Sequence, residues 1–249
     1  MINRGDRVEK LKAYLRYSAV LICVFLFGAL FYISAYDAGE AVTAGTQAQS
    51  RPVIVIDAGH GGEDGGAGAN GVLEKNINLA IALKLRDMLK MSGYEVKMTR
   101  EEDVSVYDSS AVTVREKKVS DMKNRVHIIN ENSRNVLVSI HQNKFEQSKY
   151  SGAQMFYSGN DPRSEKLAES IRQSVTSLLQ PDNHRELKKD GGSVYILKKA
   201  EVPAVIVECG FLSNEEEAGK LSSDKYQSQM AFAIYCGIIE WNKGEQNGG

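Results

Sequence analysis

Short apolar runs alternate with longer stretches of helical periodicity from Arg51 to near the C-terminus. The runs predicted as strands cover residues 53–56, 94–99, 136–140, 153–157, 194–197 and 204–207. Between and after them, apolar residues recur at helical spacing over residues 77–89, 118–132, 163–179 and 226–241. Alternation of this kind is typical of βαβ units. It predicts a single α/β domain with a largely parallel mixed sheet and helices on both faces.

Three of these strands, at residues 53–56, 136–140 and 204–207, are almost uninterrupted apolar runs. Strands that are buried on both faces of a sheet have this composition, so these three are expected at its centre. Ser213 and Glu216 have the spacing of a capping box and predict the start of a further short helix.

An apolar segment from Tyr17 to Tyr36 precedes this domain and contains no charged residue. At about 20 residues it is long enough to cross a bilayer as a helix. Basic residues dominate before it, whereas Asp37 and Glu40 follow it, so the positive-inside rule places residues 1–16 in the cytoplasm and the remainder outside. Since the segment is longer than the roughly 7–15 apolar residues of a cleaved signal peptide, a single-pass anchor in the inner membrane is favoured. Secretion after cleavage is the alternative.

The boundaries of the folded domain follow from changes in composition. Residues 37–50 are small, polar and aperiodic, which is typical of a linker. Residues 51–243 form the predicted catalytic domain, and residues 244–249 form a polar tail. The formal net charge is −1, so no basic field indicates a nucleic-acid partner.

Residues capable of metal binding or proton transfer follow the three apolar strands. His60 comes four residues after the first strand, and His141 and Glu208 come directly after the other two. Parallel strands end at the same edge of a sheet, so these side chains are expected to meet there, together with Glu74 at the start of the long helix. Two histidines and a carboxylate form one type of catalytic zinc site, and a further carboxylate can transfer protons.

Each of these residues, taken singly, also has a purely structural explanation. A histidine after a strand is more often a loop or core residue than a ligand. Glu74 in a first helical turn is favoured by the helix dipole alone. Spacing therefore leaves the metal site as a hypothesis.

Four motifs resemble those of the zinc-dependent N-acetylmuramoyl-L-alanine amidases, the AmiC-like family, and occur in the family's order. They are IVIDAGHGG at residues 54–62, EK at 74–75, SIHQN at 139–143 and PAVIVECGFLSN at 203–214. The resemblance covers about residues 52–242. The stretch REKKVSDMKNR at 115–125, with the N-terminal apolar segment, further resembles the germination-specific sporulation amidases, the CwlD type.

The resemblance implies a hydrolase that cleaves the amide bond between N-acetylmuramic acid and L-alanine in peptidoglycan. It implies that His60, Glu74 and His141 bind Zn²⁺ and that Glu208 is the catalytic acid and base. Asn143 and Arg100 match further positions near the site and are tentative substrate-binding residues.

For the sporulation subgroup the resemblance implies a setting as well as a reaction. The enzyme would act in the forespore intermembrane space, with an accessory lipoprotein as partner. A muramic acid deacetylase would then use its product to form muramic-δ-lactam in the spore cortex.

Two alternatives to the amidase remain at this point. A non-catalytic peptidoglycan-binding or scaffold protein on the same fold is disfavoured by the intact set of site residues. Another wall hydrolase, such as a metallopeptidase or deacetylase, would release different products. Many relatives have alanine after Asn143, where this chain has Lys144 and Phe145, which leaves the details of wall binding open.

Overall fold

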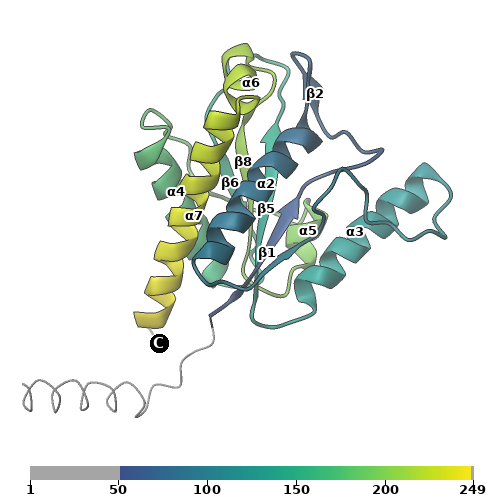
Figure 1. Cartoon of the computed structure of the whole chain (residues 1–249), viewed down its shortest axis with the longest axis horizontal. Coiled ribbons are helices and arrows are strands. Elements are labelled where there is room, and N and C mark those ends of the chain that lie inside the picture. The colour runs from purple at the N-terminus through teal and green to yellow at the C-terminus, as the bar shows by residue number, and fades with distance from the viewer. Residues whose placement is uncertain (1–50, 248–249) are drawn as a thin grey trace, which may run out of the picture. The chain divides into compact units, whose positions relative to one another are not determined.

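The computed structural model describes residues 51–247, and the predicted α/β domain with a mostly parallel mixed sheet is confirmed (Figure 1). Within these residues the main sheet has six strands in the order β4-β1-β5-β8-β6-β7. They are β4 (Val96–Met98), β1 (Val53–Ala58), β5 (Asn135–Asn143), β8 (Ala204–Phe211), β6 (Gln154–Tyr157) and β7 (Lys188–Lys189). Only the β6–β8 pair among them is antiparallel.

The predicted membrane segment at residues 17–36 and the linker at 37–50 lie outside the described residues. Among residues 51–247, every helix is too short or too polar to cross a bilayer.

Helices cover both faces of the sheet (Figure 1). One face carries α2 (Glu74–Met91), α4 (Arg163–Leu178) and α7 (Asp224–Asn247). The other carries α3 (Val114–Asn130) and α5 (Tyr195–Lys199). Two small elements lie near the carboxyl ends of the central strands: α6 (Glu215–Leu221) and a hairpin of β2 (Gly68–Ala69) and β3 (Val72–Leu73).

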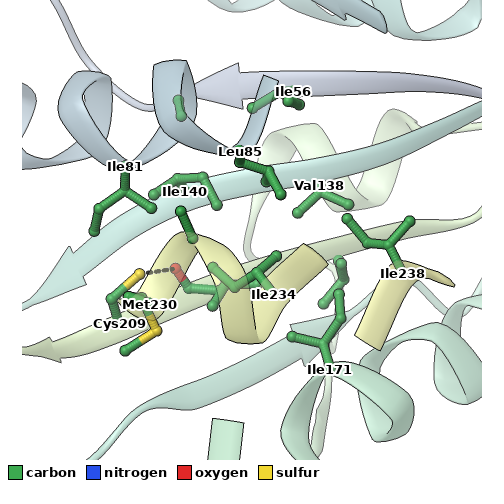
Figure 2. Packing of buried hydrophobic residues seen from close by; sticks show 14 of the residues in the cluster. Ile56, Ile81, Leu85, Val138, Ile140, Ile171, Cys209, Met230, Ile234 and Ile238 are labelled. Carbon is green, nitrogen blue, oxygen red and sulfur yellow. Dashed lines mark hydrogen bonds between the residues drawn. The ribbon is translucent and has the colours of Figure 1, made fainter. Parts of the chain in front are cut away.

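Two hydrophobic clusters hold these layers together. The larger packs alternate residues of the central strands, such as Val138 and Ile140, against Leu85 of α2 and Ile234 of α7 (Figure 2). The smaller packs the intervening strand residues, such as Leu137, against α3 and α5. Because neighbouring residues of one strand point to opposite faces, strands covered on both sides must be apolar throughout. The three central strands were predictable for this reason.

The strand predicted at 194–197 is wrong, because this segment begins the short helix α5. Its consecutive residues Ile196 and Leu197 are both buried, at 3% and 1% exposure, beside α3. Periodicity cannot distinguish a strand from a helix in an apolar run this short.

The predicted capping box is also wrong, although the helix itself exists. Asn214, one residue later than predicted, caps α6 by accepting a hydrogen bond from the backbone N–H of Glu217. The Ser213 hydroxyl instead accepts a hydrogen bond from the N–H of Phe145.

Candidate metal centre

His60, Glu74, His141 and Glu208 come from four elements that meet at the carboxyl edge of the sheet. His141 lies within β5 and Glu208 within β8, and the two are opposite one another in the parallel register. Glu74 is the first residue of α2, and His60 lies in the loop after β1. One possible ligand atom from each of His60, Glu74 and His141 lies within 4.8 Å of the others.

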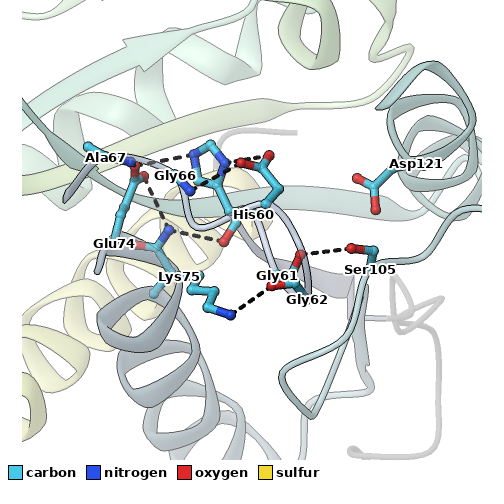
Figure 3. Close-up of polar contacts among 12 residues, drawn as sticks. His60, Gly61, Gly62, Gly66, Ala67, Glu74, Lys75, Ser105 and Asp121 are labelled. Atoms are coloured by element: carbon cyan, nitrogen blue, oxygen red, sulfur yellow. Dashed lines mark hydrogen bonds and ion pairs between the residues drawn. The ribbon is translucent and has the colours of Figure 1, made fainter. Parts of the chain in front are cut away.

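The Glu74 carboxylate bridges the two imidazoles. Its Oε2 lies 3.2 Å from Nε2 of His60, and its Oε1 lies 2.9 Å from Nδ1 of His141. Oε2 also accepts a hydrogen bond from the Ala67 N–H (Figure 3), and Oε1 accepts one from the Asn78 side chain. Because its side chain is only 4% exposed and fully bonded, Glu74 is held in a fixed orientation between the histidines.

His60 has an unusual backbone conformation, with φ at +61°. Few non-glycine residues adopt this left-handed region, although histidine is among those that do so more often, and the surroundings must compensate the strain. Lys75 and Ser105 donate hydrogen bonds to the carbonyls of Gly62 and Gly61, which fixes the loop (Figure 3). On the ring, Nδ1 of His60 lies 2.9 Å from Oδ2 of Asp64. That contact leaves Nε2 facing Glu74.

Two buried arginines hold the start of the same loop. Arg125 donates to the carbonyls of Ala58 and His60, at 3.0 and 2.8 Å. Arg100 donates to the carbonyls of Ala58 and Gly59, at 2.9 and 3.1 Å. Both guanidinium groups act on backbone oxygens, so they position the residues that lead into His60.

The Arg125 charge is balanced inside the protein by two carboxylates. Asp57 Oδ1 lies 2.5 Å from Nη1 of Arg125, and Asp121 Oδ2 lies 2.6 Å from its Nε. Ser139 and Thr99 donate hydrogen bonds to the remaining lone pairs of Asp57. This fully bonded network connects β1, β5 and α3 directly beneath the site.

Glycines leave space for the ligand side chains. A Cβ at Gly59 would lie 2.3 Å from ring atoms of His141. A Cβ at Gly66, where φ is +67°, would lie 2.6 Å from Oε2 of Glu74. Any larger residue at either position would displace a candidate ligand.

Hydrogen bonds and charges shift the pKa values of Glu74 and His60 in opposite directions. Burial alone would raise the pKa of Glu74, but hydrogen bonds from His141 and His60, and their charges, hold it well below its usual range. Burial alone would lower the pKa of His60, but Glu74 and then Asp64 raise it to about 9. In the metal-free molecule His60 therefore carries a proton, which a metal ion would displace.

Glu208 differs from Glu74 because its buried carboxyl oxygen Oε2 has no hydrogen-bond partner within the described part of the chain. Burial is the main cause that raises the pKa of Glu208 to about 7. A carboxyl group with such a pKa can both accept and donate a proton near neutrality.

The two tentative substrate-binding residues lie in different environments. Asn143 is half-buried at the end of β5, two residues beyond His141. Arg100 is only 3% exposed, and its bonds to loop carbonyls favour a positioning role, while substrate contact by either residue stays a prediction. Asp64 was not among the residues expected at the site; the signal for it in the sequence is a carboxylate four residues after His60 in the same glycine-rich loop.

The donor chemistry of the three residues fits a zinc ion. Two imidazoles and a carboxylate are a donor set typical of catalytic zinc centres, and both histidines line a hollow that Glu208 also borders. Asp64 beside His60 matches the outer carboxylates that orient metal-binding histidines.

Comparison with known proteins gives consistent results. The sequence pattern of the N-acetylmuramoyl-L-alanine amidase family matches residues 54–240. The germination-specific N-acetylmuramoyl-L-alanine amidase of Bacillus subtilis (strain 168) is 37% identical over 192 residues, which cover 77% of this chain and 80% of that protein.

Solved structures match the same region. The CwlD amidase from Clostridioides difficile, in complex with the GerS lipoprotein, is 43% identical with a TM-score of 0.75 and covers 78% of this chain and 100% of its own. The catalytic domain of CwlV, an N-acetylmuramoyl-L-alanine amidase from Bacillus (Paenibacillus) polymyxa, is 30% identical with a TM-score of 0.62. That match covers 76% of this chain and 97% of the other.

Proposed function

Since this chain belongs to the N-acetylmuramoyl-L-alanine amidase family, we propose that His60, Glu74 and His141 bind the zinc ion with which it hydrolyses peptidoglycan. The observation that carries the proposal is the cluster of these three side chains within 4.8 Å, next to the unpaired Oε2 of Glu208. The bond cleaved is the amide between N-acetylmuramic acid and L-alanine.

Glu208 transfers the protons of the reaction. Zinc, when bound, supplies Lewis-acid polarisation of the scissile carbonyl and of a water molecule. Glu208 takes a proton from the attacking water while the new carbon–oxygen bond forms at the lactyl carbonyl. It then donates this proton to the alanine nitrogen as the carbon–nitrogen bond breaks. The products are a peptide-free muramic acid and a stem peptide with a free amine.

The surrounding residues keep the ligands in place during turnover. Asp64 orients the His60 ring, and Arg125 holds the His60 carbonyl. Hydrogen bonds from Ala67 and Asn78 fix the Glu74 carboxylate. Such outer contacts are typically worth about 10- to 100-fold in metal affinity or activity.

The setting of the reaction is proposed to be the spore cortex, as the germination-specific Bacillus relative suggests. Residues 51–243 would form the catalytic domain outside the cytoplasm, held by an anchor at 17–36. A muramic acid deacetylase would convert the product into muramic-δ-lactam. By analogy with the Clostridioides complex, an accessory lipoprotein is a candidate partner.

The test uses the full-length chain with sporulation-type peptidoglycan, followed by mass spectrometry of the products. Zinc-loaded protein should release intact stem peptides that begin with L-alanine. A chelator should abolish release, and added zinc should restore it. Glu208→Gln should bind zinc but release nothing, whereas Glu146→Gln, at an exposed position in the loop after β5, should behave as wild type.

The product pattern also separates the alternatives. Shortened stem peptides would indicate a metallopeptidase, and acetate without peptide would indicate a deacetylase. A chain that binds no zinc and releases nothing, even with the accessory lipoprotein present, would favour the scaffold protein.

A further inference from the structure

Two hollows lie next to each other along α3, beside the candidate metal centre. The first, of about 250 Å³, is bordered by Glu208 and both candidate histidine ligands. The second, of about 210 Å³, extends toward Tyr107 near the N-terminus of α3. Both are lined by Asp64, Lys118, Asp121 and Met122, so we treat them as one feature, the α3 trough. Figure 3 shows Asp121 facing the loop of His60.

The floor of the α3 trough next to Glu208 is apolar. Phe156, Val194 and Ile206 line the first hollow there, and Ile206 is only 5% exposed. A sugar ring would leave its hydroxyl groups unpaired against these side chains, at a cost in free energy. A small aliphatic side chain would instead be favourably buried.

The charged residues that line the trough are almost all paired. Lys117 contacts both carboxylate oxygens of Glu63, at 2.9 and 3.0 Å. Asp64 is bonded to the His60 ring, and Asp121 is bonded to Arg125.

Lys118 and Glu208 are the exceptions. Lys118 lines both hollows and forms no ion pair with a carboxylate of residues 51–247, although its charge acts on the nearby Asp64 carboxylate. The α3 trough therefore presents one positive charge whose hydrogen-bond donors are available to a ligand.

We propose that the α3 trough binds the departing stem peptide and that Lys118 pairs with the free carboxylate of its second residue. This proposal rests on the proposed function. Glu208 protonates the leaving nitrogen, so the residue attached to that nitrogen lies beside Glu208 and places its methyl group on the apolar floor. A peptide advances about 3.3 Å per residue, so the next residue lies one step further along the hollow that Lys118 also lines. In peptidoglycan this next residue is D-glutamate, whose α-carboxylate is either free or amidated.

The test compares two synthetic muramyl dipeptides, one ending in D-glutamate and the other in its α-amide D-isoglutamine, as substrates of the zinc-loaded full-length chain. Removing one charge-assisted pair at a partly exposed site should lower kcat/KM about three- to tenfold. Wild type should therefore prefer the acid over the amide by that factor. In Lys118→Met, kcat/KM for the acid should fall to the value for the amide, whereas kcat/KM for the amide should stay unchanged. The matched control Lys123→Met, exposed on α3 but outside both hollows, should retain the preference for the acid.

A second measurement does not depend on catalysis. The released dipeptides L-alanyl-D-glutamate and L-alanyl-D-isoglutamine are titrated into each protein, and binding is followed by calorimetry. Tighter binding of the acid by wild type and by Lys123→Met, but not by Lys118→Met, would support the proposal. Equal binding of acid and amide by wild type, or an equal loss on both substrates in Lys118→Met, would overturn it. If acid-selective binding occurs without cleavage, the peptide site stands and the proposed reaction fails.

Discussion

His141 and Glu208 lie opposite one another in the parallel strands β5 and β8, but only His141 has a carboxylate partner among the described residues. The Oε2 of Glu208 is buried and unpaired, which costs free energy that a purely structural residue would not incur. A residue kept in this state is expected to serve the reaction at the expense of stability.

Glu208→Gln should separate activity from stability. Removing general acid–base catalysis should lower kcat about 10²- to 10⁴-fold. The buried charge is removed at the same time, so the zinc-free variant should be at least as stable as wild type at pH 8. Activity assays and urea denaturation check the two effects. A variant with lower activity that is also clearly less stable would indicate a structural role for Glu208.

Removal of zinc should lower the Tm of wild type, and this shift should be much smaller when Glu74 is replaced. A ligand present at a thousandfold excess over its Kd adds about 4 kcal/mol to the free energy of unfolding. For a domain of this size, each kcal/mol corresponds to about 2–4 °C in Tm, so chelation should lower Tm by about 8–16 °C. In Glu74→Gln most of this shift should disappear, since one of the three ligands is lost. A shift as large as that of wild type would exclude Glu74 as a ligand.

Gly59→Ala should damage the metal centre although it changes no ligand. The added Cβ would lie 2.3 Å from Cε1 and Nε2 of His141, so the ring must leave the position in which it contacts Glu74. Zinc affinity should fall at least about tenfold, the lower end of the effect of a displaced supporting group. The control is Gly65→Ala in the same loop, where the new Cβ would be 3.6 Å from Leu73, an ordinary contact. Equal zinc affinity in both variants would contradict the proposed ligand role of His141.

The convergence of the site could be anticipated from the sequence because it depends on one rule of sheet topology. His60, His141 and Glu208 all lie at or near the ends of apolar runs, and parallel strands bring such ends to one edge. The lengths of β5 and β8 could not be anticipated in the same way. Both continue past the apolar run to Asn143 and Phe211, so that His141 and Glu208 lie within strands rather than after them.

Contacts between distant segments account for what the sequence did not reveal. Only the folded molecule shows that Lys117 pairs with Glu63, 54 residues earlier in the chain, whereas the neighbouring Lys118 lines the trough. Local pattern contains no such information. The misassigned α5 has the same origin, since the packing of Ile196 beside α3 decides its conformation.

Asp57 should give the metal-free protein a specific sensitivity to acid. Burial alone would raise the pKa of Asp57, but the charge of Arg125, followed by that of His141 and the hydrogen bonds from Ser139 and Thr99, lowers it from its ordinary value of 3.8 to about 2. A depressed carboxyl pKa contributes stability that is present above pH 4 and lost as the pH falls through 2. The shift corresponds to about 2 kcal/mol.

Asp57→Asn should therefore change both the free energy of unfolding at pH 7 and the amount by which it falls in acid. At pH 7 it should cost about 3–5 kcal/mol, because the buried Arg125 keeps only Asp121 as a charged partner. Between pH 4 and pH 2.5 it should lose about 1 kcal/mol less than wild type, because the titrating group is gone. Urea denaturation of the zinc-free proteins at pH 7, 4 and 2.5 measures both effects. Asp182→Asn, at an exposed position after α4, should stay within about 0.5 kcal/mol of wild type throughout. If Asp57→Asn and wild type lose the same free energy between pH 4 and 2.5, the Arg125 pair is not the group that titrates.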